Sequence, residues 1–184
     1  IQHQFRKRFL DLAMRSGFQK KIITSPTGPE GIIYGDKVIN ISNNNRRQTY
    51  PAKDERYVAN GDIGIVTGQR RTKYSDFTPI QIEVELASQP GFAYKYRPSE
   101  FDSQESSPPL ELAYALTIHK TQGSEFGTTF LVVPNPCRLL TREMLYTALT
   151  RHKDKIVILH QGDFKDLQRY SHDQASEIAK RMTK

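Results

Sequence analysis

Cysteine is nearly absent from this sequence, which has one, Cys137, among 184 residues. A single thiol cannot form an intramolecular disulfide, which excludes a disulfide-stapled scaffold and fits a reducing cytoplasm. No other cysteine or histidine stands near it at metal-ligand spacing, so we predict no metal site. The sequence also lacks an apolar run long enough to cross a membrane, and its first residues lack the apolar core of a signal peptide. We therefore expect no membrane partner.

Two motifs of nucleotide-hydrolysing proteins are also missing. The sequence has no G-x-x-x-x-G-K-[ST], the loop that cradles the β- and γ-phosphates of a bound nucleotide. No apolar strand-like run ends in Asp-Glu, a pair that would hold magnesium or orient the attacking water. These two absences exclude a complete P-loop ATPase site within the sequence.

Acidic residues are fewer than basic ones, since 20 Asp and Glu against 27 Lys and Arg give a net charge of +7. Such a surplus favours an anionic partner, and nucleic acid is the usual one. Charge alone leaves open a basic surface that only keeps the protein soluble. The length suits one domain with a real core or two small ones. The chain begins without methionine inside a helical pattern, and we expect it to be a piece of a longer protein.

The first hundred residues predict a helix followed by a small all-β region. Residues 1–16 place apolar side chains on one helical stripe and arginines elsewhere, and residues 25–31 have the composition of a loop. From residue 32 to about 96, short alternating runs and the hairpin signal Asn60-Gly61 predict about five strands. So many short strands in so few residues suit a small barrel.

Two polar loops of this β region, residues 42–53 and 69–76, are candidates for nucleic-acid contact. Both are basic, and basic loops that contain an aromatic residue can grip a phosphate backbone and stack a base. Long polar loops between strands are equally often only mobile. The candidate residues for nucleic-acid binding in the second loop are Arg70, Arg71, Lys73 and Tyr74.

Strand and helix patterns alternate in the remaining part of the chain. The apolar, strand-like run Leu112 to Thr117 stops at a polar turn, His119 to Glu125. A second buried strand is expected at Phe130 to Val133, and a helix capped by Thr141 ends at Arg151. This alternation predicts a parallel sheet with covering helices. Ligands of such sheets gather at the carboxyl ends of strands, so a polar turn there suits a phosphate-handling site.

The glycine of the polar turn strengthens that interpretation. Gly123 leaves the backbone free to approach a phosphate. We expect a short helix after it, whose first N–H groups would point outward as anion donors. From the residues alone, however, a hydrogen-bonded turn histidine at His119 and a solvated arginine at a helix end are the simpler interpretations.

At this point the sequence resembles a known family. The segment ALTIHKTQGSEF is similar to motif V, and LYTALTRHKDKIVIL to motif VI, of the superfamily 1 helicases, most closely the RecD-like branch with its UvrD-like C-terminal region. Upstream, GDKVINISNNN and NGDIGIV resemble the SH3-like insertion that RecD-like helicases carry before motif V. The resemblance covers Tyr34 to about His160, and two ordered motifs with an insertion are far more specific than one motif alone.

The resemblance implies a fold class and a domain organisation. The fold would be α/β, a RecA-like second motor domain of the P-loop NTPase type, with a parallel sheet, flanking helices and an inserted small SH3-like β-barrel. Residues 1–30 would be a helix and loop of the RecA-like domain, and residues 31–99 the barrel. Residues 100–110 would form a linker, and residues 111–184 the RecA-like helicase C-terminal domain.

The resemblance also implies roles for individual residues. Arg151 would be catalytic, as the arginine finger that neutralises the charge developing on the γ-phosphate of ATP. Glu125 would lie near the ribose. The ATP-binding residues would be Gln122, Gly123, Glu125 and Arg151. The residues of motif V that contact single-stranded DNA would be Thr117, His119, Lys120 and Ser124.

The whole protein would then be an ATP-dependent DNA helicase, with ATP and Mg²⁺ as cofactors and single-stranded DNA or a DNA junction as partner. Helicases of this family divide the ATP site between two RecA-like domains, and the N-terminal one of the same protein would complete the half present here. We therefore expect the isolated chain neither to hydrolyse ATP nor to unwind DNA. By resemblance it would move 5′ to 3′ and serve recombination and repair in the bacterial cytoplasm or nucleoid.

Two other functions remain open. TALTRHK also resembles motif VI of viral-type superfamily 1 RNA helicases, although GSEF and NGDIG fit RecD-like enzymes better. A helicase-derived module that only binds nucleic acid, without catalysis, is the second possibility, and the presence of both Arg151 and Glu125 speaks against it. Stimulation of ATP hydrolysis by DNA or by RNA, and a P-loop encoded upstream, would distinguish these functions.

Overall fold

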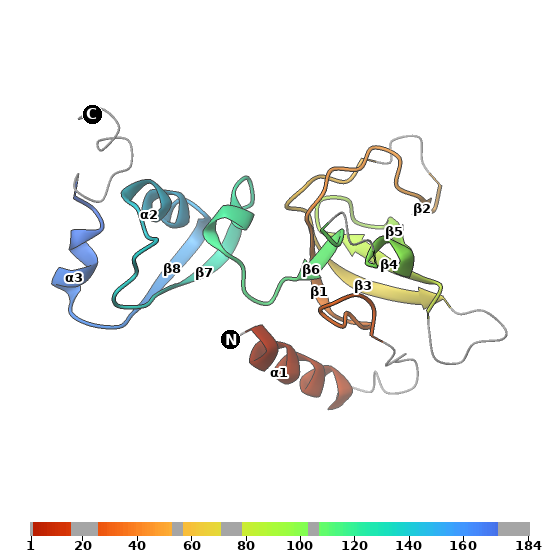
Figure 1. The fold of residues 1–184 in the computed structure, drawn as a ribbon, viewed down its shortest axis with the longest axis horizontal. Helices are drawn as coiled ribbons and strands as arrows, with labels where there is room; N and C mark the ends of the chain where they lie inside the picture. Colours follow the sequence, from red (N-terminus) through yellow and green to blue (C-terminus); the bar gives the residue numbers. More distant parts are fainter. Residues whose placement is uncertain (1, 16–25, 53–56, 71–78, 103–106, 173–184) are drawn as a thin grey trace. The chain divides into compact units, whose positions relative to one another are not determined.

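The computed structural model describes residues 2–15, 26–52, 57–70, 79–102 and 107–172. Helices and strands are mixed, and the chain divides into two compact units, residues 1–115 and 116–184, which we describe separately (Figure 1). No helix among the described residues is long and apolar enough to span a membrane.

The first unit combines one helix, α1 (Gln2–Arg15), with a six-stranded antiparallel sheet. A short 3₁₀ helix, η2 (Pro98–Glu100), follows the fifth strand. The sheet has the order β2-β5-β4-β3-β1-β6. Its strands are β1 (Lys37–Asn40), β2 (Thr49–Tyr50), β3 (Ile63–Arg70), β4 (Gln81–Leu86), β5 (Ala93–Tyr96) and β6 (Leu110–Leu112).

Sequence alternation accounts for the central strands. In β4, Ile82, Val84 and Leu86 are buried, whereas Glu83 and Glu85 face away from the core, as the period of two predicts. A turn forms at Asn60-Gly61, where the Asp62 N–H donates to the Ala59 carbonyl at 3.3 Å, but the predicted hairpin is wrong. Val58 pairs with Asn44, and β3 pairs with β1 and β4. The edge strands β2 and β6 do not pair with each other, so the sheet of the described residues is open. The predicted SH3-like barrel is therefore not confirmed.

Arg47, in the polar loop predicted at residues 42–53, binds to this sheet. The loop was expected to offer exposed basic side chains to a phosphate backbone, but the side chain of Arg47 is not exposed. The Arg47 side chain is buried, and its Nη1 donates to Glu100 Oε2 at 2.9 Å and to the Lys95 carbonyl at 3.0 Å. Its guanidinium also lies 3.9 Å from the centre of the Tyr96 ring, a cation–π contact. Arg47 therefore contributes to folding and is not available to a phosphate.

The buried phenol of Tyr96 makes the first unit sensitive to alkali. Its hydroxyl donates to Asn40 Oδ1 at 3.2 Å, and burial raises the pKa of Tyr96 well above its ordinary value. A group with a higher pKa in the folded chain contributes stability that is complete below its unfolded pKa, about 10, and is lost as the pH rises beyond it. We expect the free energy of unfolding to fall above about pH 10, and to fall less in Tyr96→Phe. Urea denaturation at a series of pH values measures this, and an equal fall in the variant would exclude the phenol as its cause.

A buried carboxylate, Asp36, joins three segments of the first unit. It accepts hydrogen bonds from Arg6 Nη2 at 2.7 Å, from the Ile33 N–H at 2.9 Å and from the Tyr114 hydroxyl at 2.9 Å. Arg6 lies off the apolar stripe predicted for its helix, but it turns toward the unit, while Phe5 is 55% exposed. The segment that leaves β6 is thereby tied to α1.

The second unit is a β-α-β arrangement with a parallel strand pair. Strands β7 and β8 pair in parallel, with Phe130 beside Val157 and Val133 beside His160, and α2 connects them. This confirms the predicted parallel sheet with a covering helix. The elements are η3 (Ile118–Thr121), β7 (Phe126–Val133), α2 (Arg142–Leu149), β8 (His152–His160) and α3 (Phe164–Arg169).

Helix α2 begins where the sequence predicts, but it ends at Leu149 and not at Arg151, with Thr150 as its C-cap. Thr141 is its N-cap, and its Oγ1 accepts the Met144 N–H at 3.2 Å, a bond that typically stabilises a helix by about 1 kcal/mol. Leu145 and Ala148 face the strands and are buried with Leu131. The helix is therefore fixed against β7 and β8, and so is the direction in which it ends.

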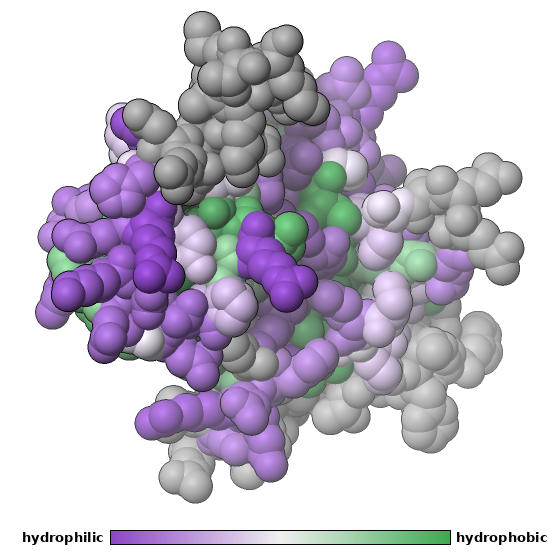
Figure 2. Space-filling view, turned by 60° about the vertical axis from the view of Figure 1, so that its left-hand side comes forward, coloured by the Kyte–Doolittle hydropathy of each residue, from purple (hydrophilic) through white to green (hydrophobic). Residues whose placement is uncertain are grey.

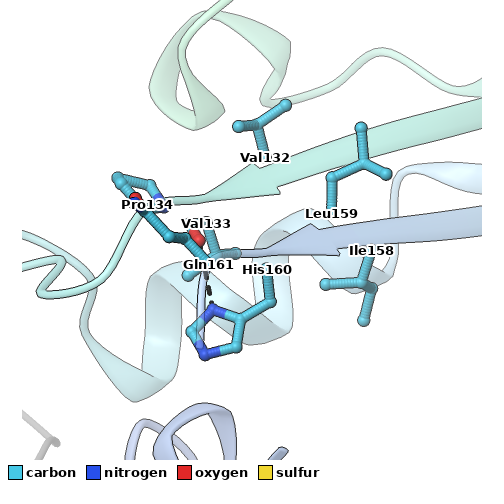
Figure 3. A pocket seen from close by; sticks show the side chains of 7 residues that line it. All are labelled: Val132, Val133, Pro134, Ile158, Leu159, His160 and Gln161. Atoms are coloured by element: carbon cyan, nitrogen blue, oxygen red, sulfur yellow. Dashed lines mark hydrogen bonds between the residues drawn. The ribbon is translucent and has the colours of Figure 1, made fainter. Parts of the chain in front are cut away.

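The opposite face of the strand pair is apolar and uncovered among the described residues. Phe130, Val132 and Leu159 on this face are 65%, 53% and 51% exposed. The close-up shows Val132 and Leu159 on one side of the two strands and Ile158 and His160 on the other (Figure 3). The face of the molecule seen in the space-filling view carries mainly polar side chains, with small apolar patches between them (Figure 2). Parallel sheets are usually covered on both faces, so this side suits a further packing partner.

The strand predicted at Leu112 to Thr117 is wrong in length and in placement. Strand β6 ends at Leu112 and pairs with β1, with Leu112 beside Val38, so it belongs to the first unit. The edge of β1 provides backbone partners for it, and Tyr114 then turns to Asp36. Our domain boundaries remain predictions, although the two compact units divide after Ala115.

Candidate phosphate and nucleic-acid site

The polar turn before β7 is a compact, hydrogen-bonded loop. In it the Thr121 hydroxyl donates to the Ile118 carbonyl at 2.7 Å, and the Ser124 N–H donates to the Thr121 carbonyl at 3.0 Å. Gly123 has φ +88°, which other residues rarely adopt. The side chain of Ile118 packs into the core of the second unit and anchors the turn. The predicted contact residues are exposed at Thr117, His119, Gln122, Gly123 and Glu125 and half-buried at Lys120 and Ser124.

No helix follows the glycine, which corrects our prediction of an anion-binding helix N-terminus. Strand β7 begins at Phe126, only three residues after Gly123. Phe126 belongs to the strand pair because its N–H donates to the Arg151 carbonyl at 2.8 Å. Side chains and turn N–H groups, not a helix end, are therefore the donors that this turn can offer to an anion.

Arg151 lies against this turn. Its Nη1 donates to the Ser124 carbonyl at 3.3 Å, and its Nε donates to the Thr147 carbonyl at 3.1 Å. Its Nη2 donates to the Thr150 hydroxyl at 3.1 Å. All three acceptors are uncharged, and no carboxylate in the described part of the chain pairs with the guanidinium. The positive charge of Arg151 is thus held in place without being neutralised, which suits an anionic ligand.

The turn and Arg151 meet at the amino ends of the parallel strands, not at the carboxyl ends that we predicted. Ser124 and Glu125 directly precede β7, and Arg151 directly precedes β8. Because the strands are parallel, the two preceding segments come to the same edge of the sheet. The strand that was expected to end at the turn is part of the other sheet, and this is why the expected edge was wrong.

Lys153 is a further member of this cluster, and the sequence motifs did not single it out. Its Nζ lies 3.3 Å from Glu125 Oε2, and both side chains are about three-fifths exposed. An ion pair so exposed contributes little to stability. It arises from the register at the start of the strands. There Phe126 pairs with His152 and Thr128 with Lys155, so β8 has one more residue than β7 between these two pairs. No local sequence signal reveals that register.

The carboxyl ends of the strands hold a different feature, an open pocket of about 450 Å³. In it His160 Nδ1 lies 3.1 Å from the Val133 carbonyl oxygen (Figure 3). The residues that line the pocket are Val132, Val133, Pro134, Ile158, Leu159, His160 and Gln161. This lining is mostly apolar and offers no Lys or Arg, so the pocket does not suit a phosphate.

The side chains of the cluster suit an anion better than a metal ion. Within the described ranges no group of three or more His, Cys, Asp or Glu side chains could hold a metal ion. The donors of Arg151, Gln122 and Lys120 suit the oxygens of an anion. Of the predicted nucleic-acid residues in the first unit, Arg70 is exposed at the end of β3. The other three, Arg71, Lys73 and Tyr74, lie outside the described residues.

Comparison with known proteins agrees with the two motifs. The family model of the UvrD-like helicase C-terminal domain matches residues 112–169. The uncharacterized protein MJ1519 of Methanocaldococcus jannaschii is 30% identical over 151 residues, 80% of this chain and 12% of that protein. The RecBCD enzyme subunit RecD of Mycobacterium tuberculosis is 47% identical over 51 residues, 27% of this chain and 9% of that protein. The ATP-dependent RecD2 DNA helicase of Deinococcus radiodurans is 49% identical over 47 residues, 25% of this chain and 7% of that protein.

The chain spans about a tenth of the length of these curated relatives. The family match begins at Leu112 and includes the turn, α2 and Arg151. The RecD subunit and the RecD2 helicase are similar to this chain, in agreement with the family match. The chain therefore belongs to the RecD-like superfamily 1 helicases, as a region that carries their UvrD-like C-terminal domain.

Proposed function

We propose that this chain is the C-terminal motor part of an ATP-dependent DNA helicase and that Arg151 is its arginine finger. The observation that carries the proposal is the position of Arg151: its guanidinium is held 3.3 Å from the Ser124 carbonyl and is paired with no carboxylate in the described part of the chain. A cation so placed can stabilise the charge that develops on a γ-phosphate. The names of RecD2 and the RecD subunits support the helicase assignment.

Around Arg151 we propose a division of the turn between two ligands. Gln122, Gly123 and Glu125 face the nucleotide, with Glu125 near the ribose. Single-stranded DNA or a junction is contacted through Thr117, His119, Lys120 and Ser124, and by the loop that carries Arg70, Arg71, Lys73 and Tyr74 on an SH3-like insertion. The exposure of most of these turn residues supports their access to ligands.

The remaining parts of the ATP site come, in this proposal, from an N-terminal RecA-like domain of the same protein. That domain supplies the P-loop and the carboxylates for Mg²⁺, since the sequence has no P-loop and the described residues form no metal site. ATP would draw the two domains together on a single strand, and hydrolysis would let them part, in a cell's cytoplasm and in recombination or repair. The uncovered apolar face of β7 and β8 supports an additional packing partner.

The proposal predicts that the purified chain alone does not hydrolyse ATP, and that the protein containing the P-loop domain does. Steady-state ATP turnover measures both, with single-stranded DNA and single-stranded RNA compared as activators at one salt concentration, because phosphate contacts weaken steeply with salt. Appreciable turnover by the chain alone would contradict the divided site. Stronger activation by RNA would favour an RNA helicase, and absence of turnover in the longer protein would favour a module that only binds nucleic acid.

A further inference from the structure

The hydroxyl of Thr150 lies between helix α2 and the Arg151 guanidinium. Its Oγ1 donates to the Thr147 carbonyl at 3.0 Å and accepts Arg151 Nη2 at 3.1 Å. The same Thr147 carbonyl accepts Arg151 Nε at 3.1 Å. These three hydrogen bonds close a ring that joins the Thr147 carbonyl, the Thr150 hydroxyl and the edge of the Arg151 guanidinium that carries Nε and Nη2.

The ring leaves the other end of the guanidinium open. An arginine has five N–H groups, of which Nε carries one and each terminal nitrogen two. The structure assigns one hydrogen bond each to Nε, Nη1 and Nη2. One N–H therefore remains on each terminal nitrogen, and these two N–H groups are available to the oxygens of a phosphate.

We propose that Thr150 is a positioning residue for the arginine finger: its hydroxyl holds one edge of the guanidinium so that the remaining N–H groups are aimed before ATP arrives. This inference rests on the proposed role of Arg151. Arginine is a long side chain with many rotamers, and an arrangement held in advance does not have to be reached during the reaction. Thr150 itself touches neither nucleotide nor DNA in this proposal.

The proposal requires the hydroxyl and not merely the shape of threonine. Valine has the same shape but can neither donate to Thr147 nor accept from Arg151, whereas serine can do both. Thr150 is exposed, so shortening its side chain leaves no cavity. The residue is thus suited to a test by conservative substitution.

The test compares Thr150→Val and Thr150→Ser in the protein that contains the P-loop domain. In Thr150→Val we expect kcat for DNA-stimulated ATP hydrolysis to fall about two- to tenfold, the effect of one lost hydrogen bond, with KM for ATP and single-strand affinity unchanged. Thr150→Ser should restore kcat to within about twofold. Ser171→Ala is the matched control, because the Ser171 hydroxyl donates to the Gln168 carbonyl at 2.6 Å after α3, the same local bond without an arginine.

The outcomes separate this inference from the function on which it rests. Normal kcat in Thr150→Val, a change in KM alone, or failure of serine to restore kcat would each overturn the positioning role. Normal hydrolysis in Arg151→Ala would overturn the finger and the positioning role together. If Thr150→Val does not fold, Thr150→Ala gives the same comparison. A direct measurement is also available: the Arg151 Nη2–H groups, one of which donates to Thr150, should exchange with solvent faster in Thr150→Val than in Thr150→Ser by NMR.

Discussion

Replacing Arg151 by alanine in the protein that contains the P-loop domain should lower kcat for ATP hydrolysis by about a thousandfold or more. The reason is that the guanidinium supplies charge where the transition state develops it, and hydrogen bonds to the Ser124 and Thr147 carbonyls hold it in place. Among the described residues, Lys153 is already paired with Glu125. Affinity for single-stranded DNA, measured by fluorescence anisotropy, should change little, because Arg151 is not among the proposed DNA contacts.

Two companion variants make this result specific. Arg151→Lys keeps the charge but loses the planar fork, so we expect only partial activity. Arg169→Ala removes an arginine that is also at a helix end but is exposed and paired with Asp166 at 3.3 Å, and it should leave kcat unchanged. Full hydrolysis in Arg151→Ala would show that the γ-phosphate is stabilised by another group.

The largest effect on stability is expected from Asp36→Ala, which should lower the free energy of unfolding by about 3 to 5 kcal/mol. Asp36 is fully buried, and Arg6 binds it through two nitrogens, at 3.0 and 2.7 Å. Removing the carboxylate leaves the partly buried guanidinium of Arg6 without its counter-charge and the hydroxyl of Tyr114 without its acceptor. Urea denaturation followed by far-UV circular dichroism measures the loss.

The network predicts the order of related variants. Tyr114→Phe removes one of the four hydrogen bonds to Asp36 and should cost about 1 kcal/mol. Glu85→Ala is a control, because Glu85 is exposed and accepts a single backbone N–H from Gly91 at 3.1 Å, and it should cost under about 1 kcal/mol. A loss in Asp36→Ala no greater than in Glu85→Ala would mean that the buried pair does not hold α1 to the sheet.

Features that depend on a few neighbouring residues were predicted correctly. The cap at Thr141, the turn at Asn60-Gly61 and the alternation along β4 are all local, because each is decided by hydrogen bonds or burial within a few positions of the chain. The two helicase motifs were also visible without the fold, and the family match confirms them. That Arg151 and the glycine turn are neighbours followed from the motifs, and the distance between Arg151 and Ser124 agrees.

Features that depend on pairing between distant segments were not predicted. Leu112 to Thr117 appeared to be one strand, but only Leu112 of this run pairs with β1, as the last residue of β6. Arg6 and Arg47 appeared to be solvated or ligand-binding cations, but carboxylates far along the chain bind them, Asp36 for Arg6 and Glu100 for Arg47. Lys153 meets Glu125 only because of the register between β7 and β8.

The sequence by itself therefore determined the family, the helix that Thr141 caps and the residue types available to a phosphate, since these are encoded by adjacent positions. Only the tertiary structure decided which edge of the parallel strands carries the cluster, which cations remain unpaired, and that Thr150 supports the guanidinium. The physical reason is that strand register and the burial of charge are settled between segments that lie far apart along the chain.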